Sequence, residues 1–224
     1  HMIFKGNPGT GKTTVARLLG RILKGIGILS KGHVVEVERA DLVGEYIGHT
    51  AQKVRENVKR ASGGILFIDE AYSLARGGEK DFGKEAIDTL VKAMEDHKSE
   101  FILILAGYRD EMEFFLNTNP GLKSRFSLQL DFPDYNMDEL MLISEKMTAA
   151  RDYKLTPKAE RKIYRLLIKS INDNKLKEGN ARLVRNIIEK SIMNQSLRVY
   201  KRSLIEKNDL IFIEKEDIPD NVFY

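Results

Sequence analysis

Gly6-Asn7-Pro8-Gly9-Thr10-Gly11-Lys12-Thr13 is the stretch that decides the fold, and it lies close to the start of the 224-residue chain. It matches the phosphate-binding pattern G-x-x-x-x-G-K-[ST]. Glycines let the backbone curl so that successive N–H groups point at phosphate oxygens, and the positive end of the following helix points to the same place. The alternative is a glycine-rich turn that contains a lysine by chance. The predicted phosphate-binding residues are Gly6, Asn7, Pro8, Gly9, Thr10, Gly11, Lys12, Thr13 and Thr14.

Within this loop we expect Lys12 to contact the β- and γ-phosphates and Thr13 to bind Mg²⁺. A strand must precede such a loop and a helix must follow it. Met2-Ile3-Phe4 is a short apolar run that ends at the loop. After the loop, helical spacing predicts one apolar face made of Val15, Leu18, Leu19, Ile22 and Ile26. Because the first run is so short, we expect the chain to begin inside its first strand; whether His1 and Met2 are native stays open.

Three further segments that are typical of strands, at 33–37, 64–68 and 101–106, alternate with amphipathic helical segments. This alternation predicts an α/β fold: a doubly wound parallel sheet with helices on both sides, over residues 1–134. Ligands of such sheets lie beyond the carboxyl ends of the strands. We expect the phosphate loop, Asp69-Glu70 and Tyr108-Arg109 to converge there.

Asp69 and Glu70 follow the apolar run Ile65-Leu66-Phe67-Ile68 directly. Phosphoryl transfer needs charge around the γ-phosphate and a water in line with it, and an acidic pair at this strand end suits that task. We expect Asp69 to hold Mg²⁺ through water and Glu70 to orient and activate the attacking water. The alternative is two solvated acids at the end of a strand.

Beyond residue 134 the alternation stops, and helical patterns cover about 136–151, 157–171 and 181–199. These patterns predict a small helical domain over residues 135–224. Thr156-Pro157 is a helix-start signal, and Asn180 is expected to be the N-cap of the last helix.

Composition excludes several classes of site. The absence of cysteine removes disulfides and thiolate chemistry and fits a cytoplasmic protein, and four histidines without ligand spacing argue against zinc. No apolar run reaches transmembrane length. The expected cofactors follow from the phosphate loop instead: a nucleotide, ATP or ADP, and Mg²⁺.

Charge is unevenly distributed: residues 151–207 carry 16 Lys or Arg against 6 Asp or Glu, a net charge of +10 in a chain of +4. Such runs are commonly solvated helix faces, and no aromatic platform for nucleic acid accompanies this one. Nucleic acid is therefore not an expected partner. A nucleotide-dependent DNA-binding loader or switch is kept as the alternative function, which salt-sensitive DNA binding would favour.

Several motifs occur together in the order found in AAA+ ATPases. They are the phosphate loop, Ile65 to Glu70, Asn119-Pro120-Gly121-Leu122-Lys123-Ser124-Arg125-Phe126 and Gly179-Asn180-Ala181-Arg182. More narrowly, the segments 41–50, 68–72 and 105–108 resemble the CbbX group, which includes red-type rubisco activase. The resemblance covers the whole chain. It implies an ATP-hydrolysing protein remodeller that assembles into a homo-oligomeric ring, most simply a hexamer, and acts on a protein client in rubisco-related or sporulation-related remodelling.

The resemblance also assigns roles to individual residues. Arg125 resembles the arginine finger that reaches the γ-phosphate of the adjacent subunit, and Arg182 resembles the sensor arginine that swings the lid domain onto the γ-phosphate. Arg125 has the alternatives of capping a helix or pairing with Asp131. Many members place Asn at the end of the fourth strand, where this chain has Tyr108, so the polar sensor there stays open between Tyr108, Arg109 and a nearby Asn.

Tyr46-Ile47-Gly48 lies between the second strand and the second helix and resembles the aromatic-hydrophobic-glycine loop that lines the pore of these rings. An aromatic and a β-branched side chain on a glycine-flanked loop can grip an extended polypeptide without reading its sequence. The alternative is that Tyr46 and Ile47 pack into the domain core. A GTPase is disfavoured because the chain has no N-K-x-D motif.

Overall fold

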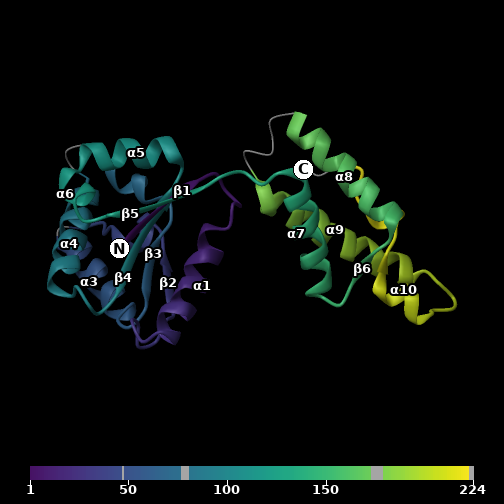
Figure 1. Ribbon diagram of the computed structural model, residues 1–224, viewed down its shortest axis with the longest axis horizontal. Helices are drawn as coiled ribbons and strands as arrows, with labels where there is room; N and C mark the ends of the chain where they lie inside the picture. Colours follow the sequence, from purple (N-terminus) through teal and green to yellow (C-terminus); the bar gives the residue numbers. More distant parts are fainter. Residues whose placement is uncertain (47, 77–80, 173–178, 222–224) are drawn as a thin grey trace. The chain divides into compact units, whose positions relative to one another are not determined.

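The computed structural model describes residues 1–46, 48–76, 81–172 and 179–221 (Figure 1). The chain forms two compact units. The sheet unit comprises His1–Gly6 and Gly11–Phe132, and the helical unit comprises Asn7–Thr10 and Pro133–Tyr224. The sheet unit thus ends at Phe132, and the tip of the phosphate loop is part of the helical unit.

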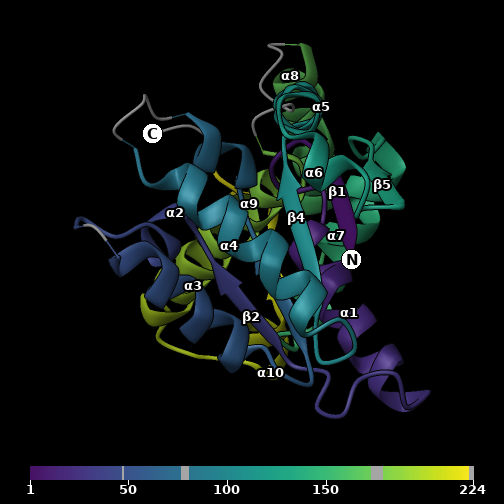
Figure 2. The ribbon, with the colours of Figure 1, turned by 90° about the vertical axis from the view of Figure 1, so that its left-hand side faces the viewer.

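Within its described residues, the sheet unit contains a sheet of five parallel strands in the order β2-β3-β4-β1-β5. Figure 2 labels four of them, β2, β4, β1 and β5, in this order from left to right. The strands are β1 (Met2–Gly6), β2 (Val34–Val37), β3 (Ile65–Ile68), β4 (Ile102–Gly107) and β5 (Leu128–Phe132). The helices are α1 (Lys12–Gly25), α2 (Arg39–Leu42), α3 (His49–Arg60), the 3-10 helix η1 (Ala71–Ala75), α4 (Gly83–Asp96), α5 (Arg109–Thr118) and α6 (Pro120–Lys123). A doubly wound parallel sheet was the expectation from the sequence, and it is confirmed.

Alternate residues of β3 face opposite sides of the sheet, as the period of two requires. Ile65 and Phe67 pack in the core that contains Ala16 of α1. Leu66 and Ile68 pack in the second core, with apolar residues of α3, α4 and α5. Helices therefore cover both faces of the sheet, which explains why β3 reads as a continuous apolar run.

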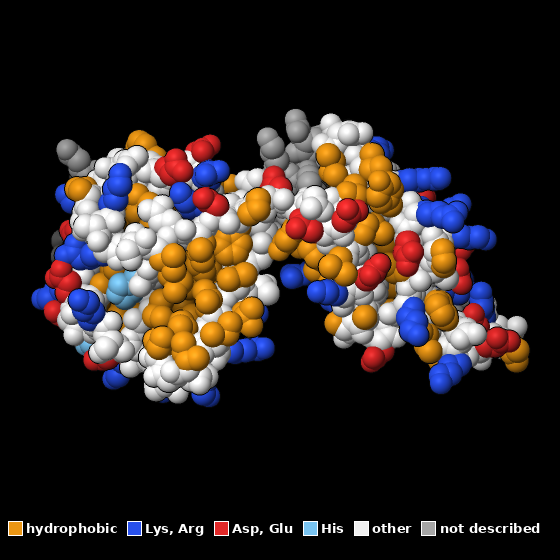
Figure 3. All heavy atoms as spheres, viewed as in Figure 1, with side chains coloured by type: hydrophobic (Ala, Val, Ile, Leu, Met, Phe, Trp, Pro, Cys, Tyr) orange, Lys and Arg blue, Asp and Glu red, His pale blue; other side chains and the backbone are white. Residues whose placement is uncertain are grey.

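The apolar face expected for α1 differs from the one that is buried. Ala16 and Gly20 are buried, whereas Leu18, Ile22 and Ile26 are exposed. The small residues are selected because the helix approaches its neighbours closely: a Cβ on Gly20 would lie 2.4 Å from the carbonyl oxygen of Gly32. Figure 3 shows the resulting apolar patch over α1.

The helical unit consists of α7 (Met137–Ala149), α8 (Pro157–Asn172), α9 (Asn180–Tyr200), α10 (Lys207–Ile211) and the 3-10 helix η3 (Lys215–Asp217), with a small parallel sheet of β6 (Lys154–Leu155) and β7 (Phe212–Ile213). Helical periodicity does not reveal strands of two residues. Leu140, Ile163, Leu167, Val184 and Ile187 are fully buried and form its core.

Side-chain hydrogen bonds stabilise the start of α7 and the last turns of α9. Asn136 and Glu139 form a capping box at the start of α7, with reciprocal side-chain bonds to backbone N–H groups of 2.9 and 2.8 Å. Arg198 of α9 donates to the buried Asp217 at 2.8 and 2.9 Å, and these bonds raise the pKa of Arg198. A buried carboxylate requires a charged or hydrogen-bonded partner. Arg198 supplies it to Asp217, and the pair therefore holds η3 against α9.

Candidate nucleotide-binding site

The phosphate loop has the backbone that only glycine adopts without strain. Gly9 and Gly11 have φ values of 74° and 91°. Gly11 is the N-cap of the 14-residue α1, which begins at Lys12. The first N–H groups of a helix lack intrahelical acceptors, so this turn is suited to bind an anion.

Side chains of the first turn of α1 lie beside this backbone. The Lys12 ammonium donates to the carbonyl of Gly6 at 2.8 Å, so the side chain folds back over the loop. Thr13 is half-buried and Thr14 is exposed. A cation and a hydroxyl are thus placed in the turn whose N–H groups are free of helical acceptors.

The acidic pair lies at the same edge of the sheet as the start of this loop. Ile68 of β3 pairs with Leu105 of β4, and Leu105 pairs with Ile3 of β1, all in parallel. The carboxyl ends of the three strands therefore share one edge. Gly6 ends β1, and Asp69 follows β3 directly.

Glu70 has an unusual backbone. Its φ of 46° and ψ of 43° are left-handed, which costs a non-glycine residue roughly 1–2 kcal/mol. Its N–H donates to Oδ1 of Asp69 at 3.0 Å, and its side chain is exposed. Backbone strain of this kind gathers at functional sites, where the surrounding structure maintains it.

Tyr72 is a residue that the analysis of the sequence did not assign to the site. Its side chain is almost fully buried in η1, two residues after Glu70. Burial raises the pKa of Tyr72 to about 12, and the charge of Glu70 and a hydrogen bond with it act in the same direction. The hydroxyl is protonated at neutral pH, as an ordinary tyrosine hydroxyl also is, and can donate to the Glu70 carboxylate. In the sequence, Tyr72 was marked only as the last residue of the segment 68–72 that resembles the CbbX group.

Tyr108 and Arg109 follow β4 and are two of the candidates for the polar sensor residue. Tyr108 is the N-cap of α5, and its ring centroid lies 6.1 Å from that of Tyr72. Arg109 makes ion pairs with Glu113 at 3.6 Å and with Asp131 at 3.5 Å. Tyr108 thus lies beside Tyr72, the residue that interacts with Glu70, while Arg109 is engaged with α5 and β5.

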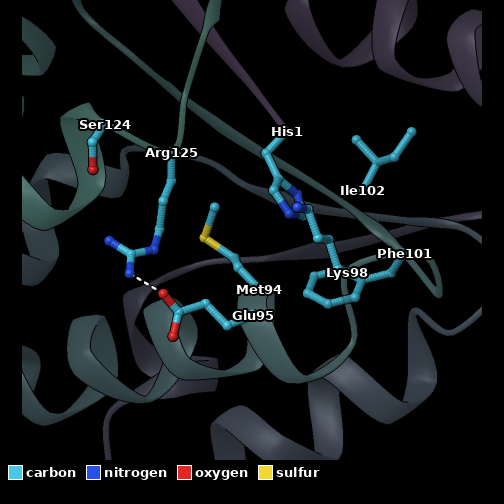
Figure 4. A pocket seen from close by; sticks show the side chains of 8 residues that line it. All are labelled: His1, Met94, Glu95, Lys98, Phe101, Ile102, Ser124 and Arg125. Atoms are coloured by element: carbon cyan, nitrogen blue, oxygen red, sulfur yellow. Dashed lines mark hydrogen bonds and ion pairs between the residues drawn. The ribbon is translucent and has the colours of Figure 1, made fainter.

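Arg125 does not lie with the phosphate loop and Asp69-Glu70. It precedes β5 by three residues, and β5 begins opposite Met2, the first residue of β1. It lines a hollow together with residues that lie before or at the start of β1 and β4, including His1 and Ile102 (Figure 4). Arg125 is therefore at the amino ends of the strands, the edge opposite to Gly6 and Asp69.

Both alternatives for Arg125 can be compared with its contacts. Its guanidinium donates to the carbonyl of Gly121 at 2.6 Å, which caps the short helix α6. It also forms an ion pair with Glu95, drawn as a dashed line in Figure 4. The pairing with Asp131 is not formed, because Asp131 interacts with Lys5 and Arg109.

In the helical unit, Arg182 is exposed near the start of α9. The expectation that Asn180 caps this helix is wrong: Gly179 is the N-cap, without a side-chain cap bond, and Asn180 is the first helical residue. The Asn180 side chain has other partners, the backbone N–H of Tyr135 and the carboxylate of Asp134. These partners lie more than 40 residues away along the chain, which no local pattern reveals.

The segment compared with a pore loop lies between α2 and α3. The Tyr46 side chain is 67% exposed, so the alternative that it packs into the core is wrong. Gly48 has a φ of 83° and is the N-cap of α3. Ile47 lies outside the described residues.

Oxygen donors suited to Mg²⁺ lie in the first turn of α1 and directly after β3. Within the described ranges, no three His, Cys, Asp or Glu side chains gather closely enough to hold a metal ion. Thr13 and Asp69 supply a hydroxyl and a carboxylate. Mg²⁺ is bound in this way at nucleotide sites, by one or two protein oxygens together with phosphates and waters.

Residues 2–134 match the family described as "ATPase family associated with various cellular activities (AAA)", and residues 136–223 match the AAA lid domain. The chain belongs to the AAA family of ATPases. The helical unit of this AAA protein contains this lid domain and is its lid unit.

Two relatives support the narrower resemblance. This AAA protein is 60% identical over 220 residues to stage V sporulation protein K of Bacillus subtilis (strain 168), covering 97% of this chain and 68% of that protein. It is 44% identical over 221 residues to protein CbbX of Cereibacter sphaeroides, covering 97% and 71%. The resemblance to the CbbX group is confirmed.

A solved structure supports the fold. The crystal structure of the FIGL-1 AAA domain in complex with ADP matches with a TM-score of 0.63 at 18% identity, covering 96% of this chain and 68% of that one. At this identity the likeness concerns the fold alone. In the described part of this AAA protein, no helix combines the length and apolar character needed to span a membrane.

Proposed function

We propose that this AAA protein is a Mg²⁺-dependent ATPase that works as a homo-oligomeric ring, most simply a hexamer, and remodels a client polypeptide. The observation that carries the proposal is the position of Arg125 at the edge of the sheet opposite to the phosphate loop and Asp69. A side chain there cannot complete its own site. It suits the site of a neighbouring subunit, because head-to-tail contacts join unlike edges and close into rings.

Nucleotide binding is assigned to the phosphate loop. The N–H groups at the start of α1 and the Lys12 ammonium supply positive charge to the phosphates. Mg²⁺, when bound, would be held by Thr13 and Asp69 and would neutralise phosphate charge. Arg182, exposed on α9, is proposed to contact the γ-phosphate from the lid.

Hydrolysis is assigned to Glu70. Its carboxylate accepts a proton from the attacking water and orients that water towards the γ-phosphate. The protonated hydroxyl of Tyr72 and the neighbouring Tyr108 place polar groups beside this carboxylate. We propose that Tyr72 and Tyr108 share the polar role that many relatives give to an asparagine.

Arg125→Ala is expected to keep nucleotide binding and to lower ATP turnover by roughly 10³-fold, since fingers supplied by a neighbour contribute at least this much in comparable systems. Mixing it with Glu70→Gln should restore turnover. At equal amounts, about one quarter of the interfaces would combine an intact Glu70 with an intact Arg125. Phosphate release by the mixture, compared with each variant alone, is the measurement.

The control for this mixture is Arg125→Ala combined with the double variant Glu70→Gln/Arg125→Ala, which supplies no finger. It should stay inactive. Turnover in the first mixture equal to the mean of its two components would refute the role of Arg125 across an interface.

Client engagement is assigned to Tyr46, and the sporulation protein at 60% identity supports a client in sporulation. Tyr46→Ala is expected to leave basal turnover and the midpoint of thermal unfolding unchanged, because the substituted side chain is exposed. Stimulation of turnover by an unfolded test polypeptide should be lost in Tyr46→Ala. It should be kept in Tyr46→Phe, which retains the aromatic side chain. Full stimulation of Tyr46→Ala would contradict the assignment.

A further inference from the structure

Two asparagine side chains meet at one carboxylate in the lid unit, which includes Asn7–Thr10. Asn180 is fully buried and donates to Oδ1 of Asp134 at 2.8 Å. Asn7, at the tip of the phosphate loop, donates to both oxygens of the same carboxylate at 2.9 and 3.1 Å. Asp134 therefore bridges the loop tip and the first residue of α9.

Backbone contacts reinforce this bridge. The N–H of Ala181 donates to the carbonyl of Gly9 at 3.1 Å, and the Tyr135 hydroxyl donates to the carbonyl of Thr10 at 3.0 Å. The approach is so close that a Cβ on Gly9 would lie 2.1 Å from the carbonyl oxygen of Gly179. The loop tip is thus bonded on both its side-chain and its backbone groups.

The residue type at 180 suits this place in two ways. Its φ is 40°, in the left-handed region that Asn tolerates better than most residues. Its amide also offers a donor and an acceptor at once: Nδ2 donates to Asp134 and to the carbonyl of Pro8 at 3.4 Å, while Oδ1 accepts from the N–H of Tyr135 at 3.0 Å. Asp would lack the donor and would face a second carboxylate, and Gly would supply the backbone alone.

We propose that Asn180 and Asp134 are positioning residues that fasten the tip of the phosphate loop to the start of α9, so that loop tip and helix respond to nucleotide as one body. The inference rests on the proposed nucleotide binding by this loop. Arg182 lies two residues further along the same helix, and its place relative to the loop tip is set by this bridge. A change in the loop on binding ADP or ATP is therefore passed directly to the lid.

The first test uses the full chain with Asn180→Gly, which keeps the left-handed backbone accessible and removes only the side chain. ADP affinity, measured by calorimetry, is expected to fall about tenfold or more. Asp134 loses its hydrogen bond from Asn180 and the Pro8 carbonyl loses its donor, so the side-chain link between the loop tip and α9 is broken. The control is Asn194→Ala. It removes a hydrogen bond of 2.9 Å to the carbonyl of Asp217 in the same unit but touches no loop residue, and it should bind ADP as the unaltered chain does.

Hydrogen exchange supplies a readout that stability alone does not move. In the unaltered chain, ADP should slow exchange in the segment 179–188, and this protection should disappear in Asn180→Gly at ADP concentrations that saturate the variant. The double variant Asp134→Asn/Asn180→Asp swaps the two side chains. It should recover part of the ADP affinity that Asn180→Asp loses, because an amide and a carboxylate again face each other.

Unchanged ADP affinity in Asn180→Gly would overturn the inference, as would an equal loss in Asn194→Ala, which would mark a general weakening of the lid. Failure of the unaltered chain to bind ADP, or equal binding by Lys12→Ala, would instead overturn the proposed function. The two failures are therefore distinguishable.

Discussion

Lys12→Ala is expected to lower ATP and ADP affinity by about 10- to 100-fold. Hydrogen bonds to charged groups contribute roughly 1.5–3 kcal/mol, and 1.4 kcal/mol corresponds to a factor of ten. The ammonium already lies over the loop, 2.8 Å from the carbonyl of Gly6, so phosphate oxygens that enter the loop meet it there. Calorimetric titration of the variant with each nucleotide is the measurement.

Lys24→Ala is the matched control, because Lys24 is exposed in the last turn of the same helix. It removes the same charge from α1 at the end away from the loop and should leave affinity unchanged. Thermal unfolding of both variants without nucleotide separates a loss of binding from a loss of folding. Equal affinities in Lys12→Ala and the unaltered chain would reject the phosphate role of Lys12.

Glu70→Gln is expected to bind ATP normally and to hydrolyse it about 10²- to 10⁴-fold more slowly, the range that general base catalysis contributes. The amide keeps the size and shape of the carboxylate but cannot take a proton from water. Gln also occupies the left-handed backbone at the same cost as Glu, so the fold should be unaffected. Single-turnover phosphate release, with affinity measured in parallel, tests this expectation.

The control for Glu70→Gln is Glu111→Gln, which neutralises another exposed carboxylate of the sheet unit. Glu111 lies on α5 and pairs with Arg76. The turnover of Glu111→Gln should match that of the unaltered chain. Normal phosphate release by Glu70→Gln would show that another group activates the water, and Tyr72 would then be the first residue to examine.

The sequence determined the features that local patterns encode. The glycines of the phosphate loop permit its unusual backbone angles, and apolar runs such as 65–68 are typical of strands buried on both faces. The loop, the parallel sheet and the position of Asp69-Glu70 after one of its strands could therefore be predicted from the sequence. The same holds for the Thr156-Pro157 signal, since α8 begins at Pro157.

Only the tertiary structure decided which surfaces meet. Periodicity made Leu18, Ile22 and Ile26 equivalent to Val15 and Leu19, but the close approach of α1 to its neighbours selected Ala16 and Gly20 for burial. Asn180 looked like an N-cap because that role depends on neighbours along the chain. Its actual partners, Asp134 and Pro8, are 46 and 172 residues away.

The same reason explains the site. Sequence placed Arg125 in a motif but not at an edge of the sheet; the register of β5 with β1 puts it at the edge opposite to the phosphate loop. Tyr72 came next to Glu70 through burial in η1, against Gly107 at the end of β4. Local sequence specifies backbone conformation and burial period, whereas contacts between distant segments depend on strand order and packing, which exist only in the folded chain.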